Sequence, residues 1–166
     1  TRHESSAASD VYKRQVIGMS MVQYKGTGNV GKLPWVGVTA AVLVYLQSLL
    51  GGLVASRWAL HQCFGIAELC TVMNSHLAGV VPPTLAVITL VVMVWRTSAL
   101  HPLLRNLANL SCLLVLIQIG LGVMTFRLRL QIELLTVSHQ AVGAALLGTL
   151  VAFTVIALRD RQVINV

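Results

Sequence analysis

The chain has 166 residues, of which 56% are hydrophobic and only 10% are charged, and its formal net charge is +7. About a quarter of the residues in a typical soluble domain are charged, so this composition excludes a soluble globular domain and indicates an integral membrane protein. The basic residues stand singly between apolar runs rather than in a patch or stripe, so we also exclude nucleic acid as a partner.

The beginning of the chain differs from the rest. Residues 1–15 read TRHESSAASDVYKRQ, a polar stretch without an initiating methionine. We interpret them as a non-native or disordered leader. Residues 16–33 are predicted to form a cytoplasmic loop that includes the stump of a preceding helix. On this interpretation the native sequence extends further upstream.

Four stretches without Asp, Glu, Lys or Arg are long enough to cross a bilayer, which takes about 20 helical residues. Helices are expected because lipid offers the backbone no hydrogen-bond partner, and the strands of a membrane barrel are shorter and alternate in polarity. The Pro82-Pro83 pair in the second stretch removes backbone donors and predicts a bend. The sequence thus predicts an all-α integral membrane bundle, 34–158, with helices at about 34–54, 71–95, 106–126 and 134–158, followed by a cytoplasmic tail, 159–166.

The basic residues near the helix ends are divided unevenly between the two sides of the membrane. Six fall on one side and three on the other. Because cytoplasmic loops carry the excess of Lys and Arg, we predict that the first side and both chain ends are cytoplasmic, in a bacterial inner or internal membrane. The first group is Lys25, Lys32, Arg96, Arg105, Arg159 and Arg161, and the outward group is Arg57, Arg127 and Arg129.

A short motif occurs twice. The sequence QSLLG begins at Gln47 and QIGLG begins at Gln118, each near the outward end of a predicted helix. An outward loop follows each motif, and the next helix carries a histidine close to its outward end, at His76 and His139. This recurrence predicts that the bundle consists of two related helix pairs.

The two histidines are candidate metal ligands. His76 and His139 are predicted to lie at the same depth on two helices, where two imidazoles can serve as axial ligands of one haem iron. Gly79 and Gly143 follow them by about one turn, on the same helix faces, and leave room for a flat macrocycle. Alternatively, both histidines hydrogen-bond across helices without a cofactor, and both glycines allow close helix packing. Candidate contacts for haem propionates are Arg57, Arg127 and Arg129.

Two of the three cysteines share the predicted outward loop. Cys63 and Cys70 lie on the oxidising side of the membrane, which favours a disulfide. We interpret it as a structural link, with thiol–disulfide exchange with a redox partner as the alternative. Cys112 lies within a helix and is expected to be a packing residue. The remaining histidines are expected in loops or in the leader, where they are solvated: His3, His61 and His101.

Together these motifs resemble the C-terminal half of haem A synthase, the membrane enzyme that converts haem O into haem A for terminal oxidases. The resemblance runs from about Gly28 to Arg161 and is carried by YLQSLLGGLVASRWALHQC, by Cys63 and Cys70, and by VMNSHLAGVVPP and LTVSHQAVGAALLG. It implies one of two similar four-helix halves.

The resemblance implies a haem b held by His76 and His139, and an outward disulfide between Cys63 and Cys70. The other half of such an enzyme binds the substrate haem O and oxidises its methyl group to a formyl group. Haem O synthase and a redox partner are the implied partner proteins. In that other half a glutamate precedes the first His by three residues, whereas Met73 stands there in this chain. This chain alone is therefore expected to be inactive.

Three further hypotheses remain. The first is a membrane cytochrome b that only carries electrons. The second is a thiol–quinone oxidoreductase, which normally needs a second reactive cysteine pair. The third is a non-catalytic assembly protein in which both histidines are structural.

Overall fold

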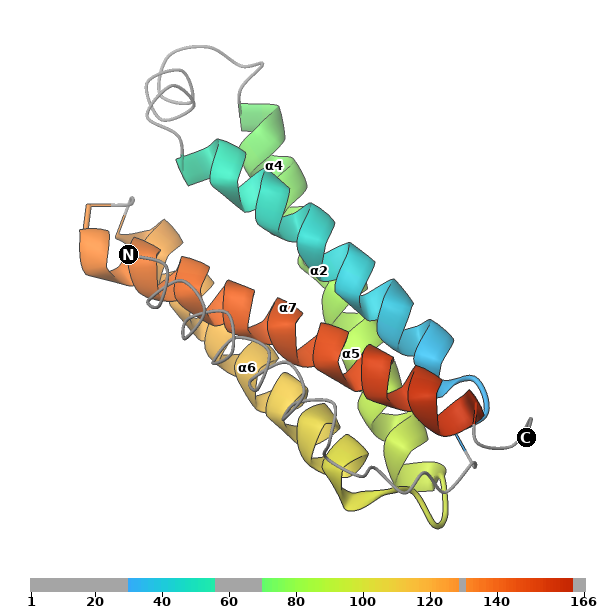
Figure 1. The fold of residues 1–166 in the computed structure, drawn as a ribbon. Coiled ribbons are helices and arrows are strands. Elements are labelled where there is room, and N and C mark those ends of the chain that lie inside the picture. Colours follow the sequence, from blue (N-terminus) through green and yellow to red (C-terminus); the bar gives the residue numbers. More distant parts are fainter. Residues whose placement is uncertain (1–29, 56–69, 129–130, 163–166) are drawn as a thin grey trace, which may run out of the picture.

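The computed structural model describes residues 30–55, 70–128 and 131–162. These residues form five helices, which make up four long apolar segments able to cross a membrane. Figure 1 shows them side by side. The helices are α2 (Leu33–Ala55), α4 (Cys70–Ala78), α5 (Val81–Arg96), α6 (Pro102–Arg127) and α7 (Glu133–Gln162).

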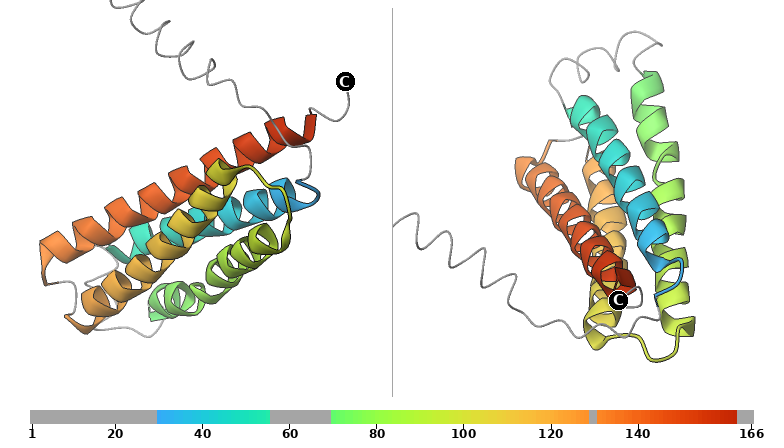
Figure 2. Two further views of the ribbon diagram at one scale, coloured as in Figure 1. Left: turned by 90° about the horizontal axis from the view of Figure 1, so that it is seen from below. Right: turned by 45° about the vertical axis from the view of Figure 1, so that its right-hand side comes forward.

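The helices form an antiparallel bundle in which each long helix contacts two neighbours. α2 packs against α5 and α7, and α6 packs against the other sides of α5 and α7. Among the described helices, α4 has its extensive contact with α2. The views in Figure 2 show α4 continuing in the direction of α5. The predicted all-α membrane bundle is therefore confirmed.

The helix bounds extend the predicted ones at several ends. α6 begins at Pro102 rather than near residue 106. Proline fits the first turn of a helix, because the N–H group that it lacks would have no partner there. The His101 imidazole caps α6 by accepting a hydrogen bond from the Leu103 N–H at 3.1 Å. α7 continues through Arg159 and Arg161, which were expected in a tail. Charged side chains at a helix end reach the membrane surface, so a membrane-spanning helix can extend beyond its charge-free stretch.

The predicted bend in the second segment is an interruption between two helices. α4 ends at Ala78 and α5 starts at Val81, with Pro82 and Pro83 in its first turn. Proline fits there because the first turn of a helix has no partners for its N–H groups. The Thr84 hydroxyl donates to the Val80 carbonyl at 2.7 Å. His76 therefore lies on a short helical segment of its own.

The buried core lies toward one end of the bundle. The helices are packed closely from their ends near Leu33 and Ala157 to about the level of Val44 and Val115. Beyond that level the described parts of α2 and α4 contain no buried side chain. The core residues include Ala40, Val87, Leu90, Val94, Leu104, Ala108, Leu146, Leu150 and Phe153.

Five basic side chains gather at the end with the packed core. The Arg105 guanidinium lies 5.8 Å from the centre of the Trp95 ring and donates to the Thr97 carbonyl at 3.3 Å. The Trp95 indole donates to Asn109 at 3.0 Å. This grouping matches the division of charge in the sequence, and the cytoplasmic orientation stays a prediction. The five are Lys32, Arg96, Arg105, Arg159 and Arg161.

Candidate functional site

The two predicted ligands come together at the sparsely packed end of the bundle. His76 on α4 and His139 on α7 each lie six residues after the first residue of their helix. Their ring centres are 6.5 Å apart and the ring planes meet at 87°. Two imidazoles that are 63 positions apart in the chain thus lie edge to face.

A glutamine on the preceding helix contacts His76. The Gln47 Nε2 lies 3.0 Å from His76 Nδ1 and donates to the His76 backbone carbonyl at 2.6 Å. One amide therefore contacts both the ring and the main chain of the same residue. This double contact ties α2 to α4 and restricts the rotation of the imidazole.

The second pair repeats this contact more loosely. The Gln118 Nε2 on α6 lies 3.3 Å from His139 Nε2. His139 Nδ1 and Gln118 Oε1 are buried and have no hydrogen-bond partner among the described residues. Buried polar atoms nearly always have partners, so these two atoms are available to a further hydrogen-bonding or metal-binding group.

Four glycines make the close approach possible. A Cβ on Gly51 would lie 2.9 Å from His76 Cε1, and one on Gly122 would lie 3.1 Å from His139 Cε1. A Cβ on Gly79 would lie 2.5 Å from Gln47 Oε1, and one on Gly143 would lie 3.0 Å from Gln118 Nε2. Each imidazole thus packs on one glycine, and each glutamine packs on another.

The site therefore consists of two matching sets of four residues. In each set a glutamine and a glycine one turn later come from the first helix. The histidine comes from the second helix, and the last glycine lies on that helix (Gly143) or directly after its end (Gly79). The sets are Gln47, Gly51, His76 and Gly79, and Gln118, Gly122, His139 and Gly143. The two helix pairs predicted from the sequence repeat thus contribute the same residue types, with similar contacts, to the site.

The separation of the rings suits a metal between them. With bonds of about 2 Å to one nitrogen of each ring, the nitrogens lie about 4 Å apart and the ring centres roughly 6 Å apart. The observed separation is 6.5 Å. In the described part of the chain, no three His, Cys, Asp or Glu side chains are grouped so that they could hold a metal ion by themselves. A metal held by these two histidines would have to bring its remaining ligands, as haem iron does.

The other predicted site residues are placed only in part. Arg127 is exposed in the last turn of α6, at the same end of the bundle as the histidines. Met73 lies one turn before His76 on α4, and Cys112 is a free, half-buried thiol in α6. Arg57, Arg129 and Cys63 lie outside the described residues, as does the side chain of Cys70.

Sequence reasoning missed half of the site. In the sequence the glutamines indicate only a repeat, and nothing there predicts that Gly51 and Gly122 contact the imidazoles. The recurring Q-x-x-L-G motif did carry the signal, because its Gln and Gly are four residues apart and share one helix face. The expected macrocycle-facing glycines, Gly79 and Gly143, lie against the glutamine amides.

In comparisons with family models, curated proteins and solved structures, nothing matches this chain. The fold and the composition define its class: it is an all-helical integral membrane protein with four segments able to span a bilayer.

Proposed function

We propose that this chain is the haem-b-binding, C-terminal half of a haem A synthase. The observation that carries the proposal is the 6.5 Å separation of the His76 and His139 rings, inside two matching sets of glutamine and glycine residues. The sequence motifs that resemble this family contain six of the eight residues in those sets, all but Gln118 and Gly122. Site geometry and motif resemblance therefore point to the same two ligands.

Each ring offers one nitrogen that its glutamine does not contact. On His76 this is Nε2, since Gln47 contacts Nδ1, and on His139 it is Nδ1, which has no partner among the described residues. Either ring nitrogen of a neutral imidazole can bind a metal. When Nε2 of His76 is the ligand, Nδ1 carries the proton and needs an acceptor. The Gln47 amide would then have to give up its bond to the His76 carbonyl and turn Oε1 toward Nδ1, to accept a hydrogen bond from it. Gln47 would then fix the tautomer and the orientation of the ligand.

A haem held here would supply one-electron chemistry, accepting electrons and passing them to a redox partner. This chain's residues would bind it and keep water from its faces. Arg127, together with Arg57 and Arg129, would meet the propionates. Oxidation of the haem O methyl group would occur in the partner half, where the catalytic glutamate is expected. Met73 at the equivalent place cannot take a proton.

A second candidate function rests on the glutamines. Gln47 contacts a nitrogen and the carbonyl of His76 without any cofactor, and interhelical hydrogen bonds of this kind stabilise membrane bundles by about 0.6 kcal/mol each on average. The histidines would then be structural, as in a non-catalytic assembly protein. A membrane cytochrome b would use the same haem site, but without the oxidation of haem O.

An optical spectrum separates these functions. We expect the detergent-purified chain to show a low-spin b-type spectrum when oxidised and when reduced with dithionite. His76→Ala and His139→Ala should each lose the haem or turn it high-spin, because each removes one axial ligand. His101→Asn is the matched control, since it replaces a histidine outside the site and retains a capping side chain. It should leave the spectrum unchanged.

A folded wild-type chain without haem would contradict the ligand assignment and favour the structural role. If haem binds, joining this chain to a partner half with an E-x-x-H motif should give conversion of haem O. Haem binding without conversion in the joined protein would favour the cytochrome b.

A further inference from the structure

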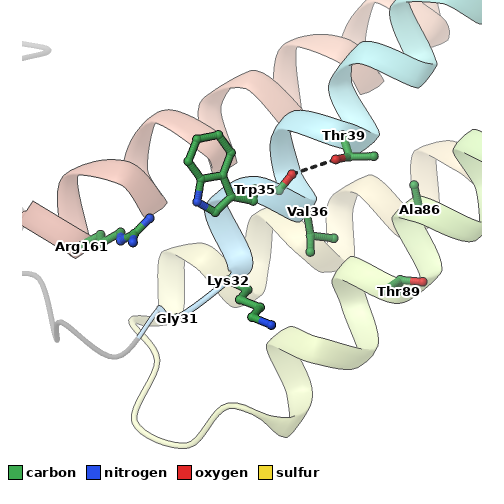
Figure 3. Close-up of a pocket in the computed structure, with 8 residues that line it drawn as sticks. All are labelled: Gly31, Lys32, Trp35, Val36, Thr39, Ala86, Thr89 and Arg161. Carbon is green, nitrogen blue, oxygen red and sulfur yellow. Dashed lines mark hydrogen bonds between the residues drawn. The ribbon is translucent and has the colours of Figure 1, made fainter.

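A groove lies at the end of the bundle opposite the histidines. Its volume is about 580 Å³. It is lined by residues at the start of α2 and in α5, and by Arg161 near the end of α7. Figure 3 shows Lys32 and Arg161 beside the helix ends that border the groove, on either side of Trp35 in this view. We call this part of the groove its mouth. Thr39 and Thr89 lie deeper, each about two turns from the ends of their helices. The groove thus reaches from the helix ends toward the middle of the membrane-spanning segments.

The mouth of the groove is positively charged. Lys32 and Arg161 are both exposed. The start of α2 adds the positive end of its dipole, which favours an anion at this place. The described residues include two acids, of which Glu133 lies at the far end of the bundle and Asp160 is fully buried. An anion at the mouth would therefore meet two accessible cations and no accessible carboxylate of the described residues.

The body of the groove is apolar but offers two donors. Trp35 is 60% exposed, as is typical of tryptophans at the level of lipid headgroups. The Thr39 hydroxyl is used within its own helix, donating to the Trp35 carbonyl at 3.0 Å. The Trp35 indole N–H and the Thr89 hydroxyl make no hydrogen bond with the described residues. Both are available to ester oxygens below a headgroup.

We propose that this groove binds one anionic phospholipid of the adjacent leaflet. Lys32 and Arg161 bind the phosphate, Trp35 lies at the glycerol level, and one acyl chain follows the wall formed by Val36 and Ala86. Basic pockets between membrane helices bind anionic headgroups in this way. A water-soluble anion would use the mouth alone, whereas the lipid also covers the apolar wall. The proposal does not depend on haem binding.

Native mass spectrometry of the full chain tests the proposal. The protein is equilibrated with equal amounts of phosphatidylglycerol and phosphatidylcholine, and retained lipid is compared between Lys32→Gln/Arg161→Gln and Arg96→Gln/Arg159→Gln. The second variant is the matched control, because it removes two exposed cations from the same end but outside the groove. We expect the wild type and the control to retain phosphatidylglycerol in preference to phosphatidylcholine. In the groove variant the ratio of retained phosphatidylglycerol to phosphatidylcholine should fall by a factor on the order of ten.

Three results would overturn the proposal: no preference in the wild type, an equal loss in both variants, or displacement of the lipid by glycerol phosphate, which would mark a simple anion site. Circular dichroism checks that each variant is folded. If the groove variant does not fold, Thr89→Trp replaces it, since this change fills the groove and keeps both cations. Thr89→Trp should exclude the lipid, and undiminished lipid retention would contradict the proposal.

Discussion

Gln47 contacts His76 at two points, with its Nε2 3.0 Å from the imidazole Nδ1 and 2.6 Å from the backbone carbonyl oxygen. The corresponding Gln118 makes one contact with His139, at 3.3 Å. Both sets of residues thus use the same chemistry, but the first is held more tightly. The difference leads to an asymmetric prediction for the two glutamines.

Replacing the glutamines should affect the two histidines unequally. We expect Gln47→Leu to lower the free energy of unfolding by about 1 kcal/mol and Gln118→Leu by less, because an interhelical hydrogen bond in a membrane bundle contributes about 0.6 kcal/mol on average. Unfolding in mixed detergent micelles measures this. Ser48→Ala is the control, since its hydroxyl bonds within its own helix to the Val44 carbonyl. Equal effects of Gln47→Leu and Ser48→Ala would contradict the prediction.

Two neighbouring glycines of α2 provide a matched test of the His76 position. Gly51→Ala places a methyl group 2.9 Å from His76 Cε1, whereas Gly52→Ala meets nothing within 4 Å. The first change must move the imidazole, so we expect loss of low-spin haem in Gly51→Ala and an unchanged spectrum in Gly52→Ala.

The second set of residues offers the same comparison. A Cβ on Gly122 would lie 3.1 Å from His139 Cε1, while one on Gly120 would meet nothing within 4 Å. We expect Gly122→Ala to weaken haem binding and Gly120→Ala to retain it, as measured by titration with haemin. Similar spectra and affinities for all four variants would show that the glycines do not position the histidines.

Gly37 lies at a close contact between α2 and α7. A Cβ there would lie 2.6 Å from Thr154 Oγ1 and 3.2 Å from Phe153 Cδ1, and both side chains are buried. We expect Gly37→Ala to destabilise the bundle by roughly 1–3 kcal/mol, the usual cost of adding atoms to a packed core. Gly148→Ala on α7, which meets nothing within 4 Å, should be near neutral in the same detergent unfolding experiment. A neutral Gly37→Ala would show that the helices shift without cost.

The four membrane segments could be predicted from the sequence because their long charge-free runs have no alternative in lipid. The helix ends were harder to predict, because Arg105 and Arg159 lie within helices and a charge-free stretch does not include them. The sequence predicts a bend where the structure has a break at Gly79 and Val80. Two prolines remove backbone donors, but this does not determine whether the helix bends or ends and starts again.

Within the site, the histidines could be predicted, since ionisable groups inside membrane segments are rare. Their partners could not, because Gln47 meets His76 only once α2 and α4 have a fixed rotation and height relative to each other. The contact of Gly51 with the imidazole depends on the same variables. The repeat showed that these residues matter together, but not which atoms touch.

The number of reactive thiols tests the predicted disulfide. If Cys63 and Cys70 are joined, the denatured but unreduced protein should show one titratable thiol, from Cys112. After reduction it should show three, since the chain has three cysteines. Cys112→Ala should lower the two numbers to zero and two. Three thiols before reduction, in protein purified from an oxidising compartment under air, would contradict the disulfide.

The orientation of the bundle can be tested with single cysteines at its two ends. Ser98→Cys lies in the connection between α5 and α6, at the end rich in basic residues, and Leu128→Cys directly follows α6 at the other end. In a background of Cys63→Ser, Cys70→Ser and Cys112→Ala, a membrane-impermeant maleimide applied to intact spheroplasts should label Leu128→Cys but not Ser98→Cys. Permeabilised membranes should give labelling at both sites, which controls for reactivity. The excess of basic side chains beside Ser98 favours the cytoplasmic side, so labelling of Ser98→Cys alone would show that the bundle is inserted the other way.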